Sequence, residues 1–463
     1  MIRSLTATPF GRALAFTVAG LLVVCAILVG LTLLQGPKLS EVQFDADAAV
    51  STSDTQLRMF ANQAVSEVDE QQVTITPAAE FTVVTSNDIV VVQFTDRLRF
   101  GTDYTVTVAG VTSLYQDRPS VFRHSFATAP AEIHFLDRAD PSVDPEGLDR
   151  IIRASPTGSD REVVWEGRQI HDFAMFDDIL AVATIAEGGS SALTLVSLVD
   201  GSTERIVLPG TGIVGELVSA GVGYLGFTFT SAIDDADQEF QQTLFTIDLE
   251  GSHLPAAVPG LDGDPIEVLS WFALPTAGEA VVQAIDESVF LIDFSGDVPA
   301  TPIGSFVDLT SASLNGDVLV VGDVFGPIAL TLEDRSEQRL ESTPVDGAIP
   351  FVGDVQLLDS DLTRVQQIAV PDAESTSFAT SLVVDTGSES RTLYESPDGA
   401  GSVEEFTVSP NGQYVAVTTV ADVASSTTDG YEIAPRPTTV STVFVDVATG
   451  AALGSVDGFD VRW

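Results

Sequence analysis

Cysteine and lysine are nearly absent from this sequence of 463 residues, which has one of each, Cys25 and Lys38. A single cysteine forms no internal disulfide, and Cys25 lies in an apolar run, so disulfide stapling and thiolate metal sites are excluded. Lys38 closely follows the same run. A P-loop, a Schiff-base lysine and a Ser–Lys dyad are therefore excluded from the folded part of the chain.

Histidine is also scarce, and its four copies form no metal-binding pattern. None lies at the i,i+2 or i,i+4 spacing that brings two ligands to one ion, so we interpret all four as structural. They are His124, His134, His171 and His253. No G-x-S-x-G motif is present, which excludes the usual nucleophile elbow of serine hydrolases.

One glycine motif, Gly210–Gly215, fits the dinucleotide-binding pattern G-x-G-x-x-G. That pattern needs a helix to open after it, so that helix N–H groups meet the pyrophosphate. The residues after Gly215 read instead as a strand and a glycine turn. We interpret the motif as a loop between repeats, and we expect no organic cofactor.

Positive charge is in short supply throughout the chain. Lys and Arg number 20 against 67 Asp and Glu, which gives a net charge of −47. Such a surface repels phosphate backbones and anionic headgroups, so nucleic acid is not an expected partner. A solvated acidic surface is the simplest interpretation of this charge.

Charge of either sign is missing from Ala13–Leu34, an apolar stretch of 22 residues. At about 1.5 Å per residue a helix of this length spans a hydrocarbon core of about 30 Å. No small-residue cleavage site follows it, so we predict an uncleaved transmembrane anchor at 13–34. Arg3 and Arg12 precede the stretch, which predicts that residues 1–12 are cytoplasmic and that the bulk is extracytoplasmic.

After the anchor the pattern changes to short strands with alternating polarity, at Val73–Thr76, Ile89–Phe94 and Tyr104–Val108. β-Branched and aromatic residues dominate them, which suits a half-buried pleated surface. We therefore predict a small β-sandwich over 38–128. Thr55–Val68 also fits an amphipathic helix, and the pattern leaves that alternative open.

The run Leu98–Gly110, which reads LRFGTDYTVTVAG, is similar to a late-strand segment of bacterial Ig-like domains from surface-layer and other envelope proteins. Those domains close with a strand like Ser125–Thr128. The resemblance implies an Ig-like sandwich that acts as a spacer or binding module and carries no catalytic residue.

Residues 131–463 repeat a unit of strands and tight turns. The clearest copy contains Glu404–Gly412, with its S-P-N-G turn, and Thr442–Gly450, with a D-x-x-T-G turn. An apolar run followed by Asp and Gly returns along the region at Leu195–Gly201, Leu244–Gly251, Val289–Gly296 and Leu382–Gly387. Repetition at such intervals indicates a repeat architecture.

The repeats resemble the WD-like and Tol-system propellers of the bacterial envelope. That resemblance implies a ring of four-stranded blades, and the length of the region predicts about seven, with six or eight left open. Three strands at the start of the region, Ile133–Leu136, Arg150–Ala154 and Arg161–Trp165, lack an inner partner. We predict that the C-terminal strand, Gly458–Trp463, completes this first blade and closes the ring.

Acidic loops are the remaining candidates for ligand binding. Asp235, Asp237 and Glu239 alternate along one loop and form a weak candidate site for Ca²⁺. Asp262 and Asp264 form a weaker pair. In both places a solvated loop is the competing interpretation.

The lack of a catalytic constellation favours a non-catalytic, membrane-anchored scaffold whose propeller face binds an envelope protein or a cell-wall component. The alternative is an exported hydrolase or lyase that uses propeller-face carboxylates, assisted by Ca²⁺. A sensor is a third option, although residues 1–12 leave little chain to signal with.

Overall fold

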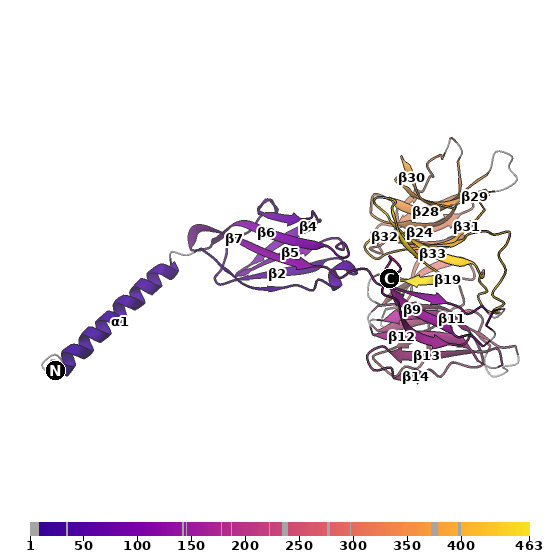
Figure 1. The fold of residues 1–463 in the computed structure, drawn as a ribbon, viewed down its shortest axis with the longest axis horizontal. Coiled ribbons are helices and arrows are strands. Elements are labelled where there is room, and N and C mark those ends of the chain that lie inside the picture. The colour runs from indigo at the N-terminus through magenta and orange to yellow at the C-terminus, as the bar shows by residue number, and fades with distance from the viewer. Residues whose placement is uncertain are drawn as a thin grey trace. The chain divides into compact units, whose positions relative to one another are not determined.

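The structure is a computed structural model that divides into two compact units, Met1–Pro130 and Ala131–Trp463 (Figure 1). The described residues are 9–33, 36–140, 143–144, 146–176, 178–186, 188–221, 223–233, 239–275, 278–296, 298–345, 347, 349–371, 378–396 and 400–463.

The first unit begins with one long helix, α1 (Pro9–Leu33). Proline is well suited to the first helical position because its missing N–H would have no partner there. The prediction of a helix at 13–34 is confirmed as far as Leu33. In the described part of the chain, no helix is found to be both long enough and apolar enough for a membrane crossing.

Two sheets make up the rest of the first unit. One sheet has the order β1 (Leu39–Gln43), β2 (Thr55–Ala61), β5 (Ile89–Phe94), β4 (Phe81–Ser86), and the other β3 (Val73–Thr76), β6 (Asp103–Ser113), β7 (Gln116–Ala127). Two short 3₁₀ helices, Ala48–Val50 and Glu70–Gln72, lie in the connections. Buried residues of both sheets form one apolar core, so the predicted sandwich is confirmed.

The stretch that also fitted a helix begins as strand β2. Leu57, Met59 and Ala61 alternate into the core, and β2 pairs along its length with β5. The helix alternative is therefore wrong for Thr55–Ala61, because sheet pairing and period-two burial decide the conformation there.

In the second unit, the described residues form seven four-stranded antiparallel sheets. The first three, in pairing order, are β10 (Glu162–Gly167), β9 (Asp149–Ala154), β8 (Ile133–Asp137), β35 (Phe459–Arg462); β11 (Ile170–Phe176), β12 (Ile179–Ile185), β13 (Ser191–Ser197), β14 (Thr203–Arg205); and β15 (Gly212–Ser219), β16 (Tyr224–Ser231), β17 (Thr243–Asp248), β18 (Ala256–Ala257).

The remaining four sheets, in the same order, are β19 (Val268–Ala273), β20 (Glu279–Ala284), β21 (Ser288–Asp293), β22 (Thr301–Ser305); β23 (Asp308–Ala312), β24 (Val318–Asp323), β25 (Gly326–Thr331), β26 (Glu337–Arg339); β27 (Phe351–Leu357), β28 (Arg364–Pro371), β29 (Phe378–Asp385), β30 (Ser390–Glu395); and β31 (Ser402–Val408), β32 (Tyr414–Val420), β33 (Val440–Asp446), β34 (Ala452–Val456). We number these sheets blades 1 to 7 in chain order.

Strand β35 is the fourth strand of blade 1, where it pairs with β8. Phe459 lies opposite Leu136, and Arg462 lies opposite His134. In Figure 1 the yellow C-terminal end accordingly lies among the purple strands of the first blade. The predicted closure is thus confirmed, and the described sheets of the second unit number seven, as the length of the region predicted.

Neighbouring blades share their apolar cores. One buried cluster joins Leu136 and Ile151 of blade 1 to Phe173 and Val182 of blade 2, and further clusters join blades 2 and 3, 3 and 4, and 4 and 5. Strands β35, β11, β15, β19, β23 and β27 contact each other in that order. These strands, with β31, are the innermost strands of a β-propeller.

Candidate binding site in the central channel

Every innermost strand is interrupted by a β-bulge. The register shift follows the first or second residue of six of these strands and the fourth residue of β15; it comes after Ile170, Gly215, Val268, Leu309, Val352, Val403 and Phe459. A bulge adds an unpaired residue and turns side chains away from the regular pleat. Acidic residues lie at or beside several of these bulges: Asp172, Glu216, Asp354, Glu404, Glu405 and Asp460.

Two of these acids have left-handed backbone conformations that are unfavourable for residues with a Cβ. Glu216 has φ +48° and Asp460 has φ +51°. Strain of this kind persists where the surrounding structure over-determines it, often at functional sites. The innermost strands therefore carry strained acidic residues, which makes the centre of the ring the candidate site.

Asp172 is held from three sides. Its Oδ2 accepts a hydrogen bond from the Leu217 amide at 2.7 Å, and its Oδ1 accepts one from the Phe173 amide at 2.8 Å. Arg462 Nη2 lies 3.3 Å from Oδ1, and the same guanidinium lies over the Phe173 ring. Innermost strands of blades 1, 2 and 3 are thus tied together at one carboxylate.

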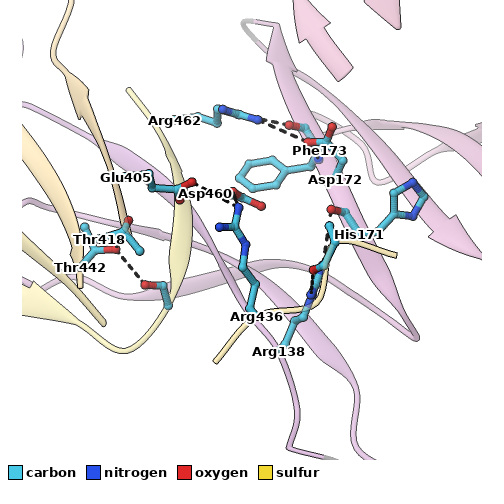
Figure 2. Close-up of polar contacts among 12 residues, drawn as sticks. Arg138, His171, Asp172, Phe173, Glu405, Thr418, Arg436, Thr442, Asp460 and Arg462 are labelled. Carbon is cyan, nitrogen blue, oxygen red and sulfur yellow. Dashed lines mark hydrogen bonds and ion pairs between the residues drawn. The ribbon is translucent and has the colours of Figure 1, made fainter. Parts of the chain in front are cut away.

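A second cation, Arg436, bridges two other carboxylates. Its Nη2 lies 3.2 Å from Glu405 Oε2 and 3.0 Å from Asp460 Oδ1. Figure 2 shows Arg436 between these two acids, with Arg462 beside Asp172. Arg436 belongs to the insertion between β32 and β33 (residues 421–439), so the insertion supplies a charge to the channel.

Burial shifts the titration of these acids. It raises the pKa of Asp172 to about 6, opposed in part by Arg462. Burial and the charge of Asp172 raise the pKa of Glu216, and burial and Asp460 raise that of Glu405. These three acids and Asp460 outnumber the two arginines, so the region favours added positive charge.

A cavity of about 290 Å³ opens beside these groups. Its lining comes from innermost strands of four blades and includes Met175, Leu217, Thr407, Arg462 and Trp463. A mouth with an arginine, an aromatic ring and apolar side chains offers both polar and apolar contacts to a ligand.

The ring closure beside the channel is fixed by the insertion. Arg138, 3% exposed, pairs with Asp429 at 2.9 Å and donates to the Ala434 carbonyl at 2.8 Å. Its guanidinium lies 4.4 Å from the Tyr431 ring centre and 5.0 Å from that of Phe459. The insertion therefore packs against strand β35 through a buried cation.

Two hydrogen-bonded contacts extend this closure. Tyr431 donates to Asp149 Oδ1 at 2.6 Å, and Asp149 Oδ2 accepts from the Ile170 amide. Thr442 donates to the Gly458 carbonyl at 2.8 Å. Blades 7, 1 and 2 are linked through polar groups here as well as through apolar packing.

The histidines have structural surroundings. His171 Nε2 meets the Val214 carbonyl at 2.8 Å, while burial lowers its pKa. Burial, with Arg153, lowers the pKa of His134 to about 4. His253 contacts Glu204, and His124 stacks on Phe126. Among described residues, no group of three or more His, Cys, Asp or Glu side chains is placed to hold a metal ion.

Of the three residues of the weak Ca²⁺ candidate, the structure describes only Glu239. Asp235 and Asp237 lie outside the described residues, and Glu239 is exposed. The interpretation of the glycine motif 210–215 as a loop between repeats is wrong for Gly212–Gly215, which form the start of the innermost strand β15. A Cβ at Gly212 would overlap the carbonyl oxygen of Thr230 on the neighbouring strand. Gly212 thus serves strand packing.

The channel acids and their arginines were not identified from the sequence. A usable signal was present, because Asp172, Glu216, Glu404 and Glu405 recur in the first strand of their repeats, beside apolar residues. Their partner Arg436 had no such signal, since it lies in an insertion of irregular sequence.

No family model matches this chain, and no curated protein matches it. Among solved structures it is similar to TolB from Acinetobacter baumannii, with 12% identity over 84% of this chain and 82% of that one, and a TM-score of 0.37. The β-propeller domain of the Trilobed protease from Pyrococcus furiosus shares 11% identity over 69% and 89%, with a TM-score of 0.42. A puromycin hydrolase shares 13% identity over 62% and 47%, with a TM-score of 0.39.

Proposed function

We propose that this chain is a non-catalytic binding protein whose propeller takes a partner of the cell envelope at the mouth of the central channel. The observation that carries the proposal is the charge balance of the channel, where three partly buried acids, Asp172, Glu405 and Asp460, and the exposed Glu216 meet two arginines. A partner that places a basic group there relieves the repulsion among the acids and lies against the apolar cavity lining.

The test is affinity capture with the full chain in a non-ionic detergent, from solubilised envelope of the source cells. The variant Glu216→Gln/Glu405→Gln removes two channel charges and keeps the side-chain volume. The control Glu333→Gln/Glu389→Gln removes the same charge from exposed positions of blades 5 and 6. A partner lost by the channel variant and kept by the control supports the proposal; equal capture by both refutes it.

One observation favours the alternative of a hydrolase or lyase. Asp172 has a pKa of about 6 beside a cavity, which is the range in which a carboxyl group exchanges protons near neutral pH. A screen with chromogenic glycoside and ester substrates at pH 5–7 tests this alternative. Turnover that disappears in Asp172→Asn, with the variant still folded by circular dichroism, would establish an enzyme.

We also propose that the first unit is an Ig-like spacer. Tyr104, fully buried near the start of β6, accepts a hydrogen bond from the Arg99 amide at 3.2 Å. A tyrosine that bonds to backbone a few residues upstream is a recurring feature of Ig sandwiches.

The extracytoplasmic location and the membrane association through residues 13–34 remain predictions that rest on the sequence. Carbonate extraction of membranes, together with protease protection of intact cells, measures both. Release of the chain by carbonate would show that the N-terminal segment is not an anchor.

A further inference from the structure

A cavity of the propeller lies away from the channel, between blades 3 and 4. Its volume is about 620 Å³, which is within the range of about 300–1,000 Å³ typical of ligand sites. Three elements form it: the hairpin 259–267, the turn 284–288 between β20 and β21, and the outer strand β22. We call this cavity the blade 3–4 groove.

The walls of the groove are fixed by backbone hydrogen bonds. Pro259 and Pro265 form a bridge, and the Gly260 amide donates to the Asp264 carbonyl at 2.8 Å. The Leu244 amide of blade 3 donates to the Ile266 carbonyl at 3.0 Å. The hairpin is therefore attached to blade 3, and a ligand meets a groove that exists before binding.

The floor and the edges of the groove are apolar. Phe290 and Ile266 are 8% and 7% exposed, and both belong to the core shared by blades 3 and 4. Leu261 and Ile285 lie higher on the walls, with exposed fractions of 59% and 47%. Exposed aliphatic side chains beside a cavity leave apolar area for a ligand to cover.

The charges around the groove have one sign. Its lining contains four carboxylates and neither lysine nor arginine, and the carboxylates are Asp262, Asp264, Glu267 and Asp286. Asp262 Oδ1 accepts the Asp264 amide at 3.1 Å, and Asp286 Oδ1 accepts the Ser288 amide at 3.1 Å, so two of them stabilise turns. In the described structure none of the four is paired with an arginine.

The separation of these four carboxylates indicates whether the groove fits a metal ion or a larger cationic ligand. No group of three or more acidic or histidine side chains in the described residues is close enough to hold one ion. An occupant that matches separated carboxylates and an apolar floor must itself be elongated, apolar and positively charged. Lysine and arginine side chains have this character, because an aliphatic stem carries a charged end.

We propose that the blade 3–4 groove binds a basic, apolar peptide segment of a partner protein, with aliphatic stems on the floor and cationic ends at the four carboxylates. A second copy of this chain fits poorly, since its net charge is −47. Strand addition to β22 is disfavoured because Pro302 lies on that edge strand. Side chains rather than backbone pairing therefore carry the recognition. Binding at the blade 3–4 groove does not depend on binding at the central channel.

The probe is an acetylated, amidated Lys-Leu-Lys-Leu-Lys-Leu peptide, titrated by calorimetry into the full chain in non-ionic detergent at about 150 mM salt, where long-range attraction by the acidic surface is screened. The variant Asp264→Asn/Glu267→Gln should bind the peptide about tenfold more weakly. The matched control Glu333→Gln/Glu389→Gln, which removes the same net charge elsewhere, should bind like the unaltered chain. Equal weakening by both variants would overturn the proposal.

Two further comparisons separate the recognition of an apolar cation from simple charge attraction. Ile285→Ser should weaken binding about threefold to tenfold, and hexalysine, which lacks leucine, should bind more weakly than the alternating peptide. n-Butylamine should bind at least tenfold more weakly than the peptide; equal affinity would show a small-amine site instead. Glu216→Gln/Glu405→Gln should leave peptide binding unchanged, so failure of the channel proposal is distinguishable from failure of this one.

Discussion

Two groups of carboxylates in the same ring have different surroundings. The channel group, with Asp172 and Asp460 as members, lies on bulged innermost strands and is contacted by Arg436 and Arg462. The blade 3–4 groove has four carboxylates on exposed turns, and its lining contains no arginine. The comparison shows that the role of an aspartate or glutamate in this acidic protein depends on its surroundings as well as on its residue type.

Burial and counter-charge account for the difference. In the channel, removal from water raises pKa values, and fixed arginines become part of the structure because an unpaired buried charge is costly. On the groove walls, water solvates each carboxylate, so the charges cost little in stability and stay available to a ligand.

Removal of Phe459–Trp463 should have the largest effect. It deletes β35, exposes the edge of β8 and removes Arg462 from Asp172. We expect loss of cooperative unfolding of the propeller, observed by circular dichroism and calorimetry. A truncated chain that melts like the intact one would show that blade 1 is stable with three strands.

Arg138→Leu should cost about 3–5 kcal/mol of unfolding free energy, because it leaves Asp429, 6% exposed, as an uncompensated buried charge. The matched control is Arg150→Leu, whose pair with Glu166 is about half exposed and should contribute less than about 1 kcal/mol. Denaturant titration measures both. Similar losses in the two variants would mean that burial of the pair does not matter.

Asp172 should make stability depend on pH. Its folded pKa of about 6 exceeds the ordinary value of 3.8, so the folded state holds the proton more tightly. Its contribution to stability is therefore fully present below about pH 4 and is lost as pH rises through 6, by about 2–3 kcal/mol. The difference in unfolding free energy between Asp172→Asn and the unaltered chain should shift by this amount between pH 4 and 7. A constant difference would show that Asp172 titrates normally.

Neutralising the groove should change stability least. Asp262→Asn and Asp264→Asn alter exposed turn residues, and we expect changes within about 0.5 kcal/mol in urea titrations at pH 7. A loss above about 1 kcal/mol would mean that these carboxylates serve the fold, as the channel acids do.

The architecture could largely be predicted from the sequence, whereas the candidate site in the channel could not. Period-two strands and recurring Asp–Gly turns predicted the sandwich and the propeller, and three unpartnered strands at Ile133–Leu136, Arg150–Ala154 and Arg161–Trp165 predicted the closure by the last strand. These patterns are local and have a fixed spacing, so they can be recognised in the sequence alone.

The channel depends on contacts that have no such spacing. Arg138 and Asp429 are 291 residues apart, and Arg462 reaches Asp172 across 290 residues. Their meeting is set by the ring as a whole, and the insertion that carries Asp429 and Arg436 has no repeat pattern. The bulges are likewise defined by pairing with the next strand, because each is one extra residue on the innermost strand, and no local motif marks its position.

Closure of blade 1 by β35 has a consequence for folding of the chain during its synthesis. During synthesis β8 to β10 emerge first among the blades, yet their sheet is complete only after the last strand has been made. Until then the nascent ring exposes an unpaired strand edge, and the contact that seals it spans nearly the whole domain. Contacts between residues so far apart in sequence form slowly. The newly synthesised chain therefore passes through an open, aggregation-prone intermediate, which chaperones and proteases can bind before any partner does.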